Sequence, residues 1–279
     1  MHRLLACFAV IALALAASAA RASASATVDM TGLQLHLVDL DPTDGIAPAV
    51  TFDPGGGSSF ASATGGYGAD AVFAGQWGTT AFSSVAAAAG PVGGVNSAIS
   101  LDGDILGSGL TAHGSAHITS QSFAVAESEV ALFSSGPAGD FFLPFTLSAH
   151  TELVISGVVS GAVAVDDTNH DVARAEMSLL LTGPFMQRQP EGQEFFELVV
   201  GGDDGPVTSA SAQQDMLVSM SNDSDDGTFG TFVGFVRAAT DNGPSAVPSV
   251  DEPGSAGLLL AGVAAVAGLA RAKGARGRA

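Results

Sequence analysis

The residues of this 279-residue chain best suited to chemistry are carboxylates and amides at alternating positions. Asp167, Asn169 and Asp171 have the spacing of the oxygen ligands that open an EF-hand calcium loop. Position six of such a loop would be Val172 instead of glycine, and position twelve would be Ser178 instead of glutamate. These departures exclude an EF-hand and leave a calcium site built on a β-turn as the hypothesis for this segment.

Two further groups of acidic residues precede glycines and allow the same two interpretations. The groups are Asp223, Asp225 and Asp226 before Gly227, and Asp39, Asp41 and Asp44 before Gly45. Aspartate near glycine is an ordinary turn sequence, and aspartates in turns also supply calcium ligands. A turn is the expected role of any single group, while the acidity of the chain favours calcium binding by at least one of them.

The histidines and nucleophiles do not form a recognisable catalytic set. His113 and His117 would pair on a helix, but on a strand they would lie about 13 Å apart, which favours solvent-facing polar residues over a zinc pair. The sequence has no G-x-S-x-G, H-E-x-x-H or phosphate-loop motif. One tryptophan and one tyrosine are few for a glycosidase cleft, so paired catalytic carboxylates are the weaker alternative. We therefore expect a protein without enzymatic activity.

Trp77, the one tryptophan of the chain, is the candidate glycan-binding residue. It stands between Gln76 and Gly78, and Tyr67 is near in sequence. An exposed aromatic ring on a β-sheet can stack on a sugar, whereas a single tryptophan in a globular protein is commonly part of the core. The sixteen phenylalanines mostly occupy alternating apolar positions, which predicts that they are core residues.

The elements that must position these residues are predicted from an alternation of apolar and polar side chains. Segment 151–165 places Leu153, Ile155 and Val159 on one face and Glu152 on the other, which is the period of a β-strand. The segments with this alternation are 121–130, 151–165, 173–182, 194–200, 214–220 and 228–237. Turn sequences separate them, and the body has no amphipathic helical period. The prediction is an all-β fold, an antiparallel β-sandwich of jelly-roll-like type. The Gly/Ser-rich segment 53–69 is expected to be a loop or a weakly ordered stretch, and the Ala/Gly-rich segment 86–97 is a candidate for another loop.

The charge of the body restricts its partners. Residues 27–250 carry three arginines and no lysine against 26 carboxylates, a formal net charge of −23. Such a surface repels nucleic acid and anionic lipid and keeps an exported protein dispersed. The single cysteine, Cys7, precedes the body, so neither a disulfide nor thiol chemistry is expected there.

The N-terminus has the pattern of a secretory signal peptide. His2 and Arg3 precede an apolar run at 4–17, where we expect a helix, and small residues follow. Two A-x-A sequences, ending at Ala19 and Ala26, fit cleavage by signal peptidase. We expect a signal peptide within 1–26 and an acidic all-β body over 27–244.

The C-terminal segment, 245–279, combines an acidic box, an apolar stretch and a basic end. The box is Val250, Asp251, Glu252 and Pro253. The apolar stretch runs from 257 to 270 and includes Gly257, Leu258, Leu259, Leu260, Ala261, Gly262, Val263 and Leu269. The basic end is Arg271, Lys273, Arg276 and Arg278. A bilayer core needs about 20 apolar residues, and this stretch is shorter. We therefore expect a short helix that anchors the protein in the membrane only transiently, with its basic end in the cytoplasm. A permanent tail anchor is the alternative.

This layout resembles the PEP-CTERM sorting domain of exported proteins of Gram-negative bacteria. Glu252-Pro253 and the small residues after it match that family, whereas Asp251 replaces the first proline of its box. The resemblance covers about the last tenth of the chain, and 37–52 also resembles the opening of β-rich exported proteins of this group. It implies a bacterium that makes exopolysaccharide, transient anchoring in the inner membrane, and cleavage near Glu252-Pro253 by an exosortase.

We expect an exported surface or extracellular-matrix protein of structural or adhesive type. Signal peptidase and an exosortase are its expected processing enzymes, and exopolysaccharide is its candidate partner. The membrane is contacted only through the C-terminal segment, and no nucleic-acid partner is expected. The alternative is a secreted carbohydrate-binding β-sandwich module, made calcium-dependent by the aspartate groups.

Overall fold

The computed structural model describes residues 23–53, 58–66, 70–119, 124–134, 143–166, 171–183, 192–202 and 207–242. The predicted signal helix, sorting box, apolar stretch and basic end all lie outside these residues. Within the described ranges, no helix is long and apolar enough to cross a membrane.

The described chain is built of β-strands, and every pairing between them is antiparallel. The strands are β1 (Ala24–Asp39), β2 (Val50–Phe52), β3 (Ser58–Gly66), β4 (Val72–Trp77), β5 (Val85–Val92), β6 (Val95–Asp104), β7 (Gly109–Ile118), β8 (Ala124–Ser134), β9 (Leu143–Leu147), β10 (Thr151–Val165), β11 (Asp171–Thr182), β12 (Gly192–Gly201), β13 (Ser209–Asn222) and β14 (Thr228–Asn242). The all-β, antiparallel prediction is confirmed.

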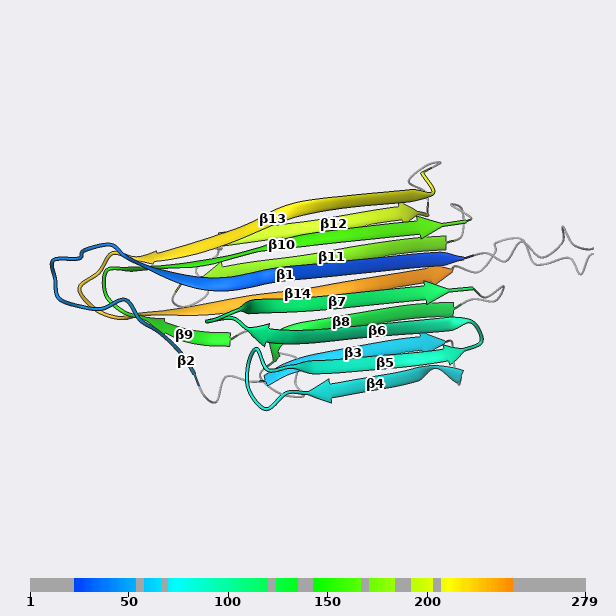
Figure 1. Cartoon of the computed structure of the whole chain (residues 1–279), viewed down its shortest axis with the longest axis horizontal. Coiled ribbons are helices and arrows are strands. Elements are labelled where there is room, and N and C mark those ends of the chain that lie inside the picture. Colours follow the sequence, from blue (N-terminus) through cyan, green and yellow to red (C-terminus); the bar gives the residue numbers. More distant parts are fainter. Residues whose placement is uncertain are drawn as a thin grey trace, which may run out of the picture. The chain divides into compact units, whose positions relative to one another are not determined.

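The strands form two sheets (Figure 1), and buried side chains from both sheets make one core. The first sheet has the order β13-β10-β1-β7-β6-β5. The second has the order β12-β11-β14-β8-β3-β4, and β9 pairs with the first half of β14 and with β2. Phe145, Phe232 and Met30 are among the largest fully enclosed side chains of the core. The architecture of the described residues is therefore sandwich-like.

Strand β10 shows how alternation produces this architecture. Leu153, Ile155 and Val159 are fully buried in the core, and the side chains between them face away from it. The strand is paired along its length with β1 on one side and β13 on the other. A shift by one residue would turn the apolar face to solvent, so the pattern determines the register. All the strands predicted from alternation occur, most of them longer than predicted.

The prediction of loops at 53–69 and 86–97 is wrong, because β3, β5 and β6 occupy most of these segments. Inward positions there carry small side chains such as Ala61, which is fully buried. The sheets approach closely at this point, and a Cβ on Gly65 would lie 3.5 Å from Val95 Cγ1 of the opposite sheet. Glycine, alanine and serine have low strand propensity, so packing between the sheets determines these strands.

Side chains join the two sheets at both ends of the strand order. At one end, Gln214 Nε2 of β13 donates to the Phe195 carbonyl oxygen of β12 at 3.2 Å and to Glu194 Oε2 at 3.3 Å. At the other end, the Ala86 N–H of β5 donates to Gln76 Oε1 of β4 at 3.1 Å. The outer face of the second sheet, between edge strands β4 and β12, carries most of the chemistry described below.

Candidate functional site

Edge strand β4 and its neighbour β3 carry three aromatic residues on the outer face of the second sheet. Phe60 is opposite Trp77, and Thr64 is opposite Phe73, so these side chains share one face. The exposed fraction is 66% for Phe73 and 47% for Trp77. Trp77 is therefore a surface residue, and the alternative that it belongs to the core is wrong.

Gly75 allows the three rings to form a continuous surface. A Cβ at this position would lie 3.1 Å from Cε1 of Phe73 and 3.3 Å from Cε2 of Phe60, so both rings lean over the glycine. The rings of Phe60 and Trp77 have centroids 4.4 Å apart and planes inclined by 36°. We name Phe60, Phe73 and Trp77 the aromatic strip. A row of partly exposed rings on a sheet can stack against the apolar faces of sugar rings.

The prediction that phenylalanines belong to the core is right for Phe145 and Phe232 and wrong for Phe73, Phe195 and Phe229, which are exposed. The available signal for Phe73 was its even spacing from Trp77, which places both on one face of a strand. Tyr67 lies outside the described residues.

A charged cluster lies on the same face, beside the strip. Glu129 of β8 is opposite Ser62 of β3 on one side and Arg237 of β14 on the other. Arg237 Nε is 3.1 Å from Glu127 Oε1, and its Nη1 is 3.3 Å from Glu176 Oε2. We name Arg237, Glu127, Glu129 and Glu176 the Arg237 cluster; no single sequence motif marks it, because its members come from three strands.

The electrostatics of the cluster follow from partial burial. Burial lowers the pKa of Arg237, but Glu127 and Glu176 raise it by more, so its pKa lies above the ordinary value. Burial also raises the pKa of Glu129, and the attraction of Arg237 only partly opposes this effect. The cluster therefore holds one cation firmly among a surplus of carboxylates.

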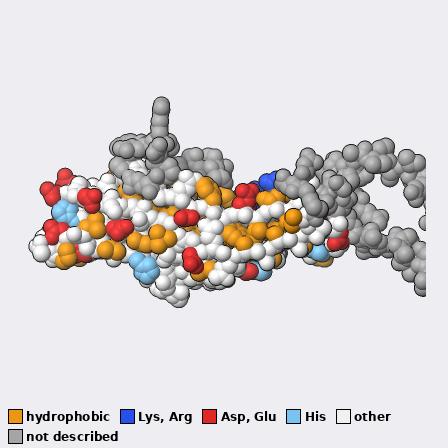
Figure 2. All heavy atoms as spheres, turned by 90° about the horizontal axis from the view of Figure 1, so that it is seen from above, with side chains coloured by type: hydrophobic (Ala, Val, Ile, Leu, Met, Phe, Trp, Pro, Cys, Tyr) orange, Lys and Arg blue, Asp and Glu red, His pale blue; other side chains and the backbone are white. Residues whose placement is uncertain are grey.

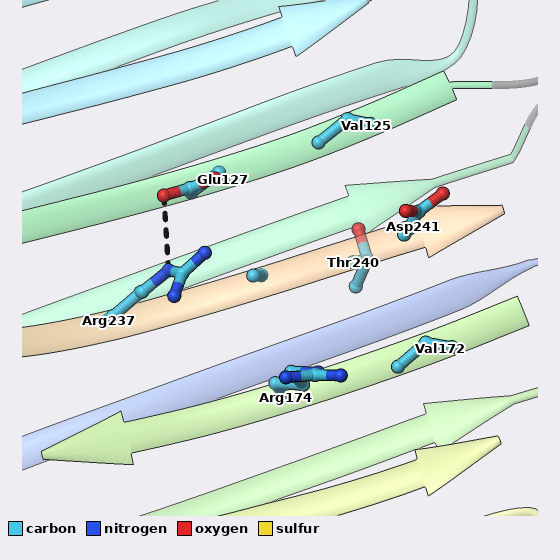
Figure 3. A pocket seen from close by; sticks show the side chains of 8 residues that line it. Val125, Glu127, Val172, Arg174, Arg237, Thr240 and Asp241 are labelled. Carbon is cyan, nitrogen blue, oxygen red and sulfur yellow. Dashed lines mark ion pairs between the residues drawn. The ribbon is translucent and has the colours of Figure 1, made fainter. Parts of the chain in front are cut away.

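A shallow pocket of about 210 Å³ adjoins the cluster (Figure 3). Arg237 of β14 and Arg174 of β11 both contribute to its lining, together with Glu127 and Asp241. Burial raises the pKa of Asp241, and Arg174 partly opposes the shift. Arg174 is exposed and forms no ion pair with another described residue, so it is the less constrained of the two arginines.

Two of the predicted aspartate groups come together around a histidine that sequence reasoning missed. His150 Nδ1 is 3.2 Å from Asp44 Oδ2 and 3.8 Å from Asp41 Oδ2, and its Nε2 is 3.0 Å from Asp225 Oδ1. Asp41 and Asp44 lie in the loop after β1, His150 in the β9–β10 turn, and Asp225 in the β13–β14 turn. His150 ties the three segments together, and only the tertiary structure places it among the carboxylates.

The loop aspartates also cap turns. Asp41 Oδ1 accepts hydrogen bonds from the N–H and hydroxyl of Thr43, which lower the pKa of Asp41, and Asp44 Oδ1 accepts one from the N–H of Ile46. Asp223 is exposed in its turn. In the part of the chain that the structure describes, no group of three or more His, Cys, Asp or Glu residues is arranged to hold a metal ion.

The remaining candidates do not join these sites. Asp167 and Asn169 lie outside the described residues, and Asp171 is buried at the start of β11. His113 and His117 both lie on β7, and His113 Nδ1 pairs with Asp29 of β1. A strand separates residues four apart by about 13 Å, so the two histidines do not share a metal ion.

Comparisons of the chain with protein-family models, with curated proteins and with solved structures found no match.

Proposed function

We propose that this chain is an exported surface or matrix protein of adhesive type that holds polysaccharide on the aromatic strip. The observation that supports this function is the continuous row of Phe60, Phe73 and Trp77 on an edge of the second sheet. Contiguous exposed apolar surface on a soluble protein commonly marks a binding site when the patch is large. Flat aromatic surface at the sheet edge suits an extended glycan better than a buried small molecule.

The proposed protein binds the glycan without cleaving it. Glu127 and Glu129 of β8 lie on the same face as the strip, and Glu127 is engaged by an arginine. Acid and base catalysis at a glycosidic bond requires two carboxyl groups that face the substrate from its two sides. Glycan recovered unchanged in chain length after prolonged incubation with the protein is the expected result.

The test uses the intrinsic fluorescence of Trp77. Because the chain has a single tryptophan, a change in its emission on addition of a polysaccharide reports this site alone. Phe73→Ala keeps the probe and removes one ring, and we expect affinity to fall at least about tenfold. The matched control is Phe195→Ala, an exposed phenylalanine at the opposite edge of the same sheet, which should leave affinity unchanged.

A panel of polysaccharides that leaves Trp77 emission unchanged and is not retained by the protein would contradict the proposed function. Equal losses in Phe73→Ala and Phe195→Ala would also contradict it, because binding would not depend on the strip. Repeating the titration with calcium and then with a chelator tests the calcium-dependent form of the proposal.

Delivery to the cell surface is the second part of the proposal, and it rests on the resemblance of 245–279 to a sorting domain. Intact mass, measured on protein from the envelope and from the medium of its own host, should lack the signal peptide and the residues beyond about Pro253. A chain that keeps its C-terminus in the membrane fraction would show a tail anchor instead.

A further inference from the structure

We propose that the glycan held by the aromatic strip carries free amino groups and is cationic. This inference rests on the proposed function and adds the chemical class of the ligand. The preferred ligand is an amino-sugar polymer in which the amine is not acetylated.

The first observation is the position of the carboxylates relative to the strip. Ser62 is opposite Gly75 of the strip's strand and also opposite Glu129 of β8. Neighbouring strands are about 4.8 Å apart, so the Glu129 backbone lies about 10 Å from that of Gly75. The residue between them, Ser62, has a small side chain. A sugar chain lying across the strands would pass from the rings to Glu129 within about two sugar units.

The second observation is that Glu129 has spare capacity for a cation. Arg237 is engaged by Glu127 at 3.1 Å and by Glu176 at 3.3 Å, and Glu129 forms no ion pair with it within 4.0 Å. Burial raises the pKa of Glu129, because the ionised carboxylate is poorly hydrated there. An ammonium group brought to this carboxylate would restore favourable interactions that water does not supply.

The third observation is the charge around the site. The space-filling view, which looks onto the β12 and β13 side of the sheets, shows carboxylates scattered over that side and few basic side chains (Figure 2). Beside the strip itself, Glu127 and Glu129 lie on β8, and Arg237 on the next strand is engaged by Glu127 and Glu176. Arg174, the arginine without an ion pair in the described part of the chain, lies on β11, three strands beyond β3. An acidic glycan would be repelled by the net negative charge of the protein and, among the described residues, would meet no unpaired arginine or lysine beside the strip. Charge complementarity therefore favours a cationic glycan over a uronate polymer.

The experiment compares glycans that differ only in charge. Glucosamine oligomers, their fully N-acetylated counterparts of equal length, and uronate oligomers are titrated against the full exported protein at a pH where the amine is protonated, with Trp77 emission as the readout. We expect the amino form to bind at least about tenfold more tightly than the acetylated form. Its affinity should fall with added salt, since charge attraction is screened.

Glu129→Gln is the informative variant, and Glu197→Gln is its control. Both remove one carboxylate from the same outer face, but Glu197 lies on β12 at the opposite edge. Glu129→Gln should lower affinity for the amino form several-fold and leave the acetylated form unchanged. Glu197→Gln should change neither. Far-UV circular dichroism and the Trp77 emission maximum verify that each variant is folded.

The outcomes separate this inference from the proposed function. Equal affinity for amino and acetylated oligomers, tightest binding of uronates, or equal effects of the two variants would overturn the cationic class and leave glycan binding intact. Failure of all three oligomers, together with a wider polysaccharide panel, would overturn both.

Discussion

Replacing Arg237 by methionine removes the cation from the Arg237 cluster while it keeps much of the side chain's apolar length. Glu127, Glu129 and Glu176 then share one sheet face with no described counter-charge between them. Their mutual repulsion and poor hydration would both act against folding.

The magnitude follows from the exposure of the partners. The side chains of Arg237, Glu127 and Glu176 are 33%, 36% and 17% exposed. The energy of the cluster should therefore lie between that of a fully exposed ion pair and that of a buried one. Exposed ion pairs contribute about 0.2–1 kcal/mol, whereas removal of one partner from a buried pair costs about 3–5 kcal/mol. We expect Arg237→Met to lower the free energy of unfolding at pH 7 by about 2 kcal/mol, roughly a 30-fold change in the unfolding equilibrium.

Urea denaturation followed by Trp77 emission and by circular dichroism measures this change. The control is Arg174→Met, which removes the same charge from an exposed residue that has no ion pair with another described residue and should change stability by no more than about 0.5 kcal/mol. Because burial raises the pKa of Glu129, this carboxylate is protonated as pH falls, and the deficit of Arg237→Met should then shrink. Equal stabilities of the two variants, or a deficit that stays constant between pH 7 and pH 4, would refute this account of the cluster.

Three further predictions concern single positions. Burial raises the pKa of Glu129 in the folded state above its pKa in the unfolded chain, so ionisation of Glu129 destabilises the fold as pH rises between the two values. Glu129→Gln should therefore raise the free energy of unfolding at pH 7 and change it little at pH 4, as measured by urea denaturation. A Cβ on Gly230 would lie 2.4 Å from Cζ of the buried Phe145, so Gly230→Ala should cost about 1–3 kcal/mol in the same assay, whereas Gly227→Ala, which makes only ordinary contacts, should be nearly neutral. Because Ala24 at the start of β1 is buried in the core, N-terminal sequencing of the exported protein should find signal-peptide cleavage before this strand. Cleavage after Ala26 would contradict this prediction and show that the first residues of β1 are not needed for folding.

Strand positions were predictable where large apolar side chains alternate with polar ones. The segment 151–165 coincides with β10, because its period of two is unambiguous and both of its neighbours in the sheet need the same face buried. The loops expected at 53–69 and 86–97 were wrong because alanine and glycine carry little local signal. Their strands exist through pairing and contact with the opposite sheet, and neither is visible in a single segment.

The candidate sites divide in the same way. Trp77 could be selected from its residue type, and the aspartate groups from their spacing before glycines. Their partners could not, because Phe60 joins Trp77 through strand pairing, and His150 joins Asp44 and Asp225 across three separate turns. Such contacts depend on the register and order of strands, which residue spacing along the chain does not specify.

The sequence by itself determined the all-β class, the acidity of the body and the direction in which most side chains point, because these depend on composition and on a local period of two. The tertiary structure decided which side chains meet. Strand order brought Arg237 between glutamates from two other strands, and the edge position of β4 left Phe73 and Trp77 in solvent. Both features depend on long-range pairing, which is set by the packing of the whole core.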